Sequence, residues 1–204
     1  MQIQLSELSP AEIYHLMTQT IVPRPIAWVL TESSESNYNL APFSYFSAVS
    51  SAPPLMMFSV GKKPNGDDKD TVVNVTKTKK MVIHIASDDM YKDVTQSAAT
   101  LEHGESELAL TGLKTTKFEG FDLPRLNDCK VAFGCKLYEI QHLGQAPQTL
   151  VFAEIETIYV ADDVVVKDAK GRDKIQSDLI KPLARLGAAE YASFGEIIEQ
   201  QRPK

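Results

Sequence analysis

Cysteine is scarce in this chain, with two, Cys129 and Cys135, among 204 residues. On one continuous strand the two residues would lie ~20 Å apart, whereas a disulfide requires Cα atoms within about 7 Å of each other. We therefore expect two reduced thiols in the protein core. Free thiols are usual in reducing compartments, so we also expect a cytoplasmic protein.

Long apolar runs are missing as well. The most apolar windows, Leu55–Val60 and Met81–Ala86, have the length of strands and fall short of the ~18 residues that a membrane-spanning helix needs. The first residues, Met1–Thr20, are polar and are interrupted by Ser9-Pro10, which is not the pattern of a signal peptide. The sequence therefore predicts no membrane partner.

The chain also lacks an excess of positive charge. Lys and Arg number 21 against 27 Asp and Glu, which gives a formal net charge of −6. Proteins that bind nucleic acid carry a basic stripe or patch, and because none is visible we expect no nucleic-acid partner. An anionic small ligand would need local cations or a helix N-terminus to hold it.

Several motifs that mark a particular chemistry do not occur in the sequence. It has no G-x-G-x-x-G, no Walker loop, no H-E-x-x-H and no G-x-S-x-G. Because dispersed ligands are weak evidence, we predict no metal site from the four separated histidines, which are His15, His84, His103 and His142. No catalytic side chain is identified.

Strand patterns dominate what is present. Short runs rich in β-branched and aromatic residues predict strands at Ile26–Thr31, Leu55–Val60, Met81–Ala86, Cys129–Gln141 and Thr149–Val160. A further run, Leu40–Val49, contains Pro42, which predicts an edge strand or an irregular crossing. Gly134 predicts a β-bulge within its strand.

Helical patterns are few. A capping box with proline at its second position, Ser9–Glu12, predicts a first helix. Asp70 is the predicted N-cap of a helix over Thr71–Thr78. Further helices are predicted over Met90–Ala99, capped by Asp88 or Asp89, and, with interruptions, within Leu179–Gln200.

Regular strand–helix alternation is missing, so a doubly wound sheet is excluded. We predict one domain over residues 1–204 of the mainly β class, an antiparallel β-barrel with peripheral helices. Its core would cover about residues 20–165, and a tail at 178–204 would pack on the core or on a partner subunit.

Three segments carry side chains suited to an anionic or aromatic ligand. Asn39–Ser44 has backbone groups that Pro42 keeps out of a regular ladder, and Lys69-Asp70-Thr71 would form a cationic helix start suited to phosphate. Arg185 and Tyr191 would present a guanidinium and a phenol from the tail. Each segment also fits a plainer interpretation: a kinked edge strand, a solvated helix cap and an amphipathic tail.

Together these segments resemble one family. The order and spacing of Val22–Val29, Asn39–Phe46, Ser50–Pro54 and Lys69-Asp70-Thr71-x-x-Asn74 are similar to the flavin-reductase-like family of FMN-binding split barrels, of the flavoredoxin type. The match covers about residues 20–85 and continues more weakly through Glu107–Leu113 to Arg185–Tyr191. The resemblance implies a six-stranded Greek-key split barrel that works as a homodimer, with FMN near the subunit interface.

The resemblance also implies which residues bind the cofactor. Thr31, Ser59 and the Lys69-Asp70-Thr71 turn would lie at the ribityl-phosphate. The segment with Asn39, Ala41, Pro42 and Ser44 would run beside the isoalloxazine ring, and Arg185 and Tyr191 would close over it, with Arg24 a secondary candidate. Three features depart from the family pattern: the turn Glu32–Asn39 lacks the usual glycine, His84 stands where asparagine is more usual, and Ala188 replaces a glycine.

The function that the resemblance implies is an NAD(P)H-dependent flavin oxidoreductase, in which hydride passes to flavin N5 and electrons pass on to an unidentified acceptor. Two alternatives stay open: an FMN-binding electron-transfer protein without its own nicotinamide site, and a split-barrel protein that binds another aromatic ligand. Since 204 residues leave no room for a separate nicotinamide domain, NADH or NADPH would bind at the flavin face itself.

Overall fold

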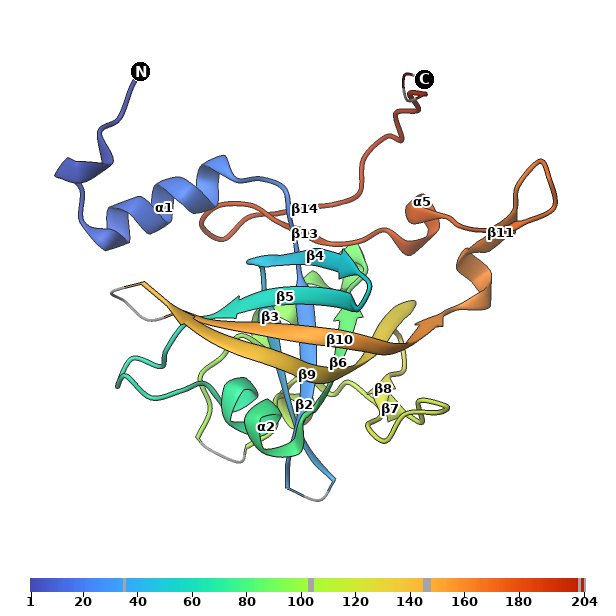
Figure 1. Cartoon of the computed structure of the whole chain (residues 1–204), viewed down its shortest axis with the longest axis horizontal. Helices are drawn as coiled ribbons and strands as arrows, with labels where there is room; N and C mark the ends of the chain where they lie inside the picture. The colour runs from blue at the N-terminus through green and yellow to red at the C-terminus, as the bar shows by residue number, and fades with distance from the viewer. Residues whose placement is uncertain (35, 103–104, 145–147, 202, 204) are drawn as a thin grey trace.

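A strongly curled sheet forms the centre of the molecule. The computed structural model describes residues 1–34, 36–102, 105–144, 148–201 and 203 (Figure 1). Seven strands pair in the order β3-β2-β6-β9-β10-β5-β4, and every neighbouring pair is antiparallel. They are β2 (Ala27–Ser34), β3 (Asn37–Phe43), β4 (Phe46–Ser51), β5 (Pro54–Val60), β6 (Lys80–Ile85), β9 (Val131–Leu143) and β10 (Gln148–Val160).

The sheet is split between its two edge strands. β3 and β4 are the edges, yet only Ser44 and Tyr45 separate them in the chain. The Ser59 N–H donates to the Tyr45 carbonyl over 2.9 Å, which fastens this corner to β5. In Figure 1, β5 and β10 accordingly run across β2 and β3. The mainly β, split-barrel prediction is confirmed.

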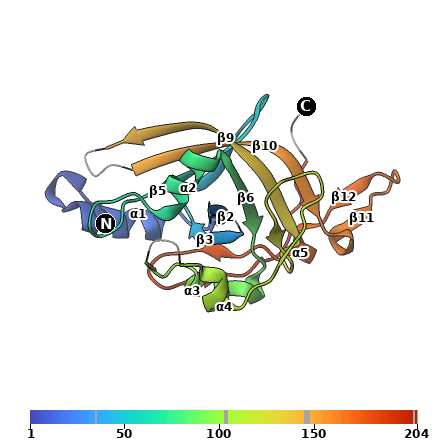
Figure 2. The same cartoon turned by 90° about the horizontal axis from the view of Figure 1, so that it is seen from below.

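Short elements surround the barrel. The helices are α1 (Pro10–Thr20), α2 (Asp70–Thr78), α3 (Tyr91–Gln96), α4 (Glu107–Thr111) and α5 (Ser177–Ile180), with 3₁₀ turns η1 (Leu5–Glu7), η2 (Asp88–Met90) and η3 (Asp162–Val164). Three minor sheets pair β1 (Arg24–Pro25) with β13 (Ala184–Arg185) and β14 (Tyr191–Ala192), β7 (Thr115–Thr116) with β8 (Arg125–Leu126), and β11 (Val165–Lys167) with β12 (Asp173–Ile175). α2 lies on one side of β3, and α3 and α4 lie on the other (Figure 2).

Several predicted elements are confirmed. The capping box of α1 is present, since the Ser9 hydroxyl accepts from the Glu12 N–H and the Glu12 carboxylate accepts from the Ser9 N–H. Pro42 lies on an edge strand, where a missing N–H is tolerated. The bulge expected at Gly134 is not in its own strand: the extra residue opposite Gly134 is in β10, between Ile155 and Thr157.

Other predictions are wrong. The run Leu40–Val49 forms two strands instead of one, so the main sheet has seven strands and not the implied six. Lys69, in extended conformation, is the N-cap of α2, and Asp70 is its first residue. The helix expected over Met90–Ala99 is only α3, preceded by η2, and the N-caps are Met90 for α3 and Ser87 for η2. The tail after α5 forms β13 and β14 instead of a helix: Lys181 ends α5 in a left-handed conformation, and Arg185 then pairs with Arg24 and Tyr191.

β2 is buried on both faces. Trp28 and Leu30 enter one apolar cluster, and Ala27 and Val29 enter a second, as the alternation of a strand requires. Each cluster holds one of the two cysteines, and both are free thiols. The prediction of two unpaired core cysteines is confirmed.

His84 is part of this buried centre. Its Nδ1 lies 3.0 Å from the Trp28 carbonyl oxygen, and its Nε2 accepts from the Leu126 N–H over 2.9 Å. This pair of contacts assigns the proton to Nδ1. Burial lowers the pKa of His84 to about 4, so the ring is neutral near pH 7. Its two bonds bridge β2 and β8.

Within the described residues, no helix combines the length and apolar character needed to cross a membrane.

Candidate functional site

A hollow lies beside β3 and opens to solvent. Its walls are the outer part of β3, the loop and first turn of α2, the segment 97–101 that follows α3, and the start of α4. Six residues expected to bind a cofactor line it: Asn39, Ala41, Pro42, Lys69, Asp70 and Thr71.

A hydrogen bond joins the two predicted motifs at the base of this hollow. The Asn39 Nδ2 donates to Thr71 Oγ1 over 3.1 Å, and both side chains are buried. Since a hydroxyl has one hydrogen and two lone pairs, Thr71 still has a hydrogen with which to bind a ligand. The edge strand and the start of α2 therefore form one wall.

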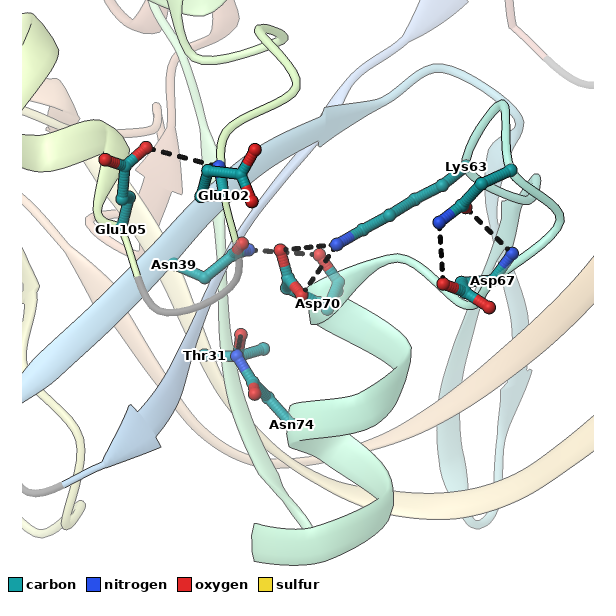
Figure 3. A network of polar contacts seen from close by, with 10 residues as sticks. Thr31, Asn39, Lys63, Asp67, Asp70, Asn74, Glu102 and Glu105 are labelled. Atoms are coloured by element: carbon teal, nitrogen blue, oxygen red, sulfur yellow. Dashed lines mark hydrogen bonds and ion pairs between the residues drawn. The ribbon is translucent and has the colours of Figure 1, made fainter.

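Two ammonium groups line the same wall. Lys63 Nζ lies 3.0 Å from Asp70 Oδ1 and 3.2 Å from Oδ2 (Figure 3). Lys69 Nζ lies 5.9 Å from the centre of the Phe43 ring, and partial burial lowers the pKa of Lys69. Lys63 is not among the predicted residues, because a turn returns it to the site: its N–H donates to the Asp67 carbonyl over 2.8 Å.

Glu107 is a second residue that the motifs did not single out. It is 5% exposed, and its Oε2 accepts from the Leu40 N–H over 2.8 Å. The neighbouring Ser106 hydroxyl donates to the Tyr38 carbonyl. Burial raises the pKa of Glu107, and the negative charge of Asp70 raises it further. The weaker similarity over Glu107–Leu113 indicated this segment but assigned it no role.

Five predicted residues lie outside the lining of the hollow, and three of them, Thr31, Ser44 and Ser59, belong to the barrel strands or the corner between them. Thr31 is fully buried, and its Oγ1 accepts from Asn74 Nδ2 over 3.0 Å (Figure 3). Ser44 Oγ accepts from Arg24 Nε over 3.4 Å, at the corner between β3 and β4. Ser59 Oγ donates to Gln148 Oε1 over 3.4 Å.

Arg24 is held by backbone carbonyls. Its Nη1 donates to Thr18 and Ile21 over 2.6 and 2.7 Å, and its Nη2 donates to Leu186 over 2.8 Å. These bonds tie the end of α1 to the turn between β13 and β14. With its guanidinium engaged in this way, Arg24 stabilises the fold instead of lining the hollow.

Arg185 and Tyr191 lie on a different surface of the molecule from the first hollow. The Arg185 guanidinium carbon lies 4.6 Å from the centre of the Tyr191 ring, and the Tyr191 hydroxyl accepts from Thr95 Oγ1 over 3.0 Å. Tyr191 lines a more open hollow that also includes Asp88 and Asp89. Because Thr95 belongs to α3, the tail is fastened to the helix that leads into the 97–101 wall of the first hollow.

Among the described residues, no three His, Cys, Asp or Glu side chains gather in a way that could hold a metal ion. His103 lies outside the described residues.

Comparison with known proteins places this geometry in context. The model of the family described as "Flavin reductase like domain" matches residues 18–172. The chain is similar to nitrilotriacetate monooxygenase component B from Bacillus cereus, at 31% identity and TM-score 0.88 over 98% of each chain.

Two further solved structures share the fold. The 2-nitrobenzoate 2-nitroreductase NbaA of Pseudomonas fluorescens is 28% identical, with TM-score 0.86 over 100% of this chain and 96% of that one. A protein of Shewanella frigidimarina, described as a flavin reductase with a split barrel domain, is 23% identical, with TM-score 0.84 over 100% of both chains. The likeness to the Shewanella protein bears on the fold alone.

Proposed function

The chain belongs to the flavin reductase-like family, and from this premise we propose that it binds FMN and works as an NAD(P)H-dependent flavin oxidoreductase. The family and the similar structures support a flavin-related oxidoreductase role. The identity of the cofactor as FMN, the nicotinamide donor and the homodimer are parts of the proposal.

The donor set of the hollow fits the proposed cofactor. A phosphate requires cationic groups or a helix N-terminus, and Lys69 and the first turn of α2 supply both. A planar ring requires a flat, partly apolar wall with a few polar groups, which Ala41 and Pro42 supply next to Asn39. The observation that carries the proposal is that segments 30 residues apart, at Asn39 and Lys69, meet in one hollow.

Bound FMN would supply the redox chemistry by accepting hydride and passing electrons on, and the side chains of this chain would bind and orient it. In this proposal Lys69 and Thr71 hold the phosphate end with their side chains, and Asp70 contributes as the first residue of the α2 N-terminus. Thr31 supports them from beneath through Asn74.

The remaining predicted residues have roles at the edges of the proposed site. Ser44 lies near the reactive edge of the ring, and Ser59 lies near the ribityl chain. In the proposed homodimer, Arg185 and Tyr191 close over the flavin from the partner subunit. A cytoplasmic location remains a prediction from the free cysteines.

A two-step experiment tests the proposal. Purified protein is titrated with FMN under an absorbance spectrum, and the complex is then mixed anaerobically with NADH or NADPH. Flavin bands perturbed by binding, followed by rapid bleaching with one of the nucleotides, are the expected result. Perturbed bands without bleaching would favour the electron-transfer protein. A spectrum that is only the sum of protein and free FMN would overturn FMN binding and favour another aromatic ligand.

A further inference from the structure

Glu107 links the hollow to the edge of the barrel. Its carboxylate accepts from the Leu40 N–H over 2.8 Å. The Leu40 N–H therefore faces α4 and does not pair with a neighbouring strand. Leu40 stands between Asn39 and Ala41, both of which line the hollow. Glu107 thereby fixes the strand segment that forms the wall, and its own side chain lines the same hollow.

The charges that line the hollow nearly cancel, and Glu102 and Glu105, which precede α4, lie outside the lining. Among the described residues that line the hollow, the charged ones are Lys63, Lys69, Asp70 and Glu107. Asp70 is paired with Lys63, so an ionised Glu107 offsets Lys69. On the other elements packed against α4, Tyr38 of β3 is packed against the core, and Lys92 and Asp93 of α3 do not line the hollow.

We propose that Glu107 sets how tightly the hollow holds a phosphate-bearing flavin: through Leu40 it positions the wall, and through its negative charge it opposes the phosphate. This inference rests on the proposed function. An anion that enters a nearly neutral hollow gains little net Coulomb attraction, whereas neutralising Glu107 leaves Lys69 uncompensated. With Glu107 ionised, the affinity for the phosphate is therefore weaker, and such an affinity suits a flavin that is released and rebound.

The effect depends on pH with a definite sign. Burial and Asp70 raise the pKa of Glu107, while the Leu40 N–H and Lys63 oppose that rise. Below the raised pKa the carboxyl is neutral and does not oppose an anion, and above it the opposing charge is present. The contribution of Glu107 therefore weakens FMN binding as pH rises. FMN itself ionises with a pKa of about 6, so only a comparison with a variant isolates this contribution.

The variant Glu107→Gln separates charge from position. A glutamine oxygen can still accept from the Leu40 N–H, but it carries no charge. Ser106→Ala is the matched control, because it removes the adjacent bond to the Tyr38 carbonyl and leaves the charge of the hollow unchanged. Riboflavin, which lacks the phosphate, is the matched ligand. Dissociation constants for FMN and riboflavin are measured by calorimetry at about pH 5.5 and about pH 8, with thermal unfolding of each variant.

The expected result at the higher pH is that E107Q binds FMN roughly tenfold more tightly than wild type. Its riboflavin affinity should stay within about twofold, and the advantage for FMN should shrink at the lower pH. S106A should leave the ratio of FMN to riboflavin affinity unchanged. If E107Q does not fold, Glu107→Ala should show the same rise in that ratio, even though both affinities fall.

An unchanged ratio in a folded Glu107 variant, with FMN bound by wild type, would overturn this inference and leave the proposed function intact. Wild-type protein that binds neither flavin would overturn the proposed function, and this inference with it.

Discussion

Asn39 and Thr71 are 32 residues apart in the chain, and their side chains meet through a buried hydrogen bond of 3.1 Å. A parallel contact, from Asn74 to Thr31 over 3.0 Å, lies deeper and outside the lining of the hollow. The two bonds fasten α2 to β3 and to β2. Both are bonds from an asparagine amide to a threonine hydroxyl, but only the first lies at the hollow. Comparing variants of the two therefore separates an effect on flavin binding from an effect on stability.

Asn39→Ala should lower both stability and flavin affinity. Losing the amide leaves the buried Thr71 hydroxyl without this donor, at a cost of about 1–2 kcal/mol in the free energy of unfolding, and it loosens one wall of the hollow. Asn74→Ala is the matched control: we expect a similar loss of stability in urea unfolding, with flavin affinity nearly unchanged. Equal effects of the two variants on affinity would show that the Asn39 contact is purely structural.

Lys69→Ala combined with Thr71→Ala should weaken FMN retention. The double variant removes an ammonium and a hydroxyl from the proposed phosphate end, and we expect a loss of roughly 10- to 100-fold in affinity, measured by titration. Lys117→Ala removes an exposed lysine that pairs with Glu119 in a surface contact, and it should have no effect. Unchanged affinity in the double variant would remove the phosphate assignment.

Arg24→Lys should destabilise the fold even though it keeps the charge. A single ammonium cannot reach Thr18, Ile21 and Leu186 with the geometry of a guanidinium. We expect the free energy of unfolding to fall by about 2–3 kcal/mol, measured by denaturant titration. A variant as stable as wild type would mean that these carbonyls are satisfied equally well by water.

His84 should make the protein sensitive to acid. Its pKa is about 4 in the folded state against an ordinary value of 6.5, so between these values the unfolded chain binds a proton that the native state refuses. Stability is therefore fully present above about pH 6.5 and is lost as pH falls toward about 4, by up to roughly 3 kcal/mol.

The test of this prediction compares wild type with His84→Asn, which offers a donor and an acceptor without titrating. Subtracting the two pH profiles of unfolding free energy cancels the contribution of the carboxylates. A flat difference between about pH 4 and about pH 7 would contradict the lowered pKa.

Local patterns predicted the barrel correctly, and six of the residues predicted to bind the cofactor line one hollow. The strands follow from runs of β-branched and aromatic residues, and the edge position of β3 follows from Pro42. The error at Asp70 arose because aspartate is a common N-cap, whereas here Lys69 adopts the capping conformation. Apolar spacing suggested a helical tail, but the pairing of Arg185 with Tyr191 and with Arg24 makes it a small sheet.

The residues that sequence reasoning missed depend on contacts between distant segments. Lys63 reaches the hollow through a turn at Asp67, and Glu107 reaches it because α4 docks on the edge of β3. Neither contact leaves a local pattern, since both partners are ordinary charged residues in polar segments. Such residues can be identified only when the structure shows how α4 packs on the edge of β3.

The cover on β3 has one further consequence. An unpaired edge strand is the usual template on which another chain adds a strand and starts to aggregate. Here the Tyr38 carbonyl is occupied by Ser106, the Leu40 N–H is occupied by Glu107, and Pro42 has no N–H to offer. The open edge at the split of the barrel therefore does not pair with a strand from another chain. The segment at the start of α4 prevents association of two copies along that edge.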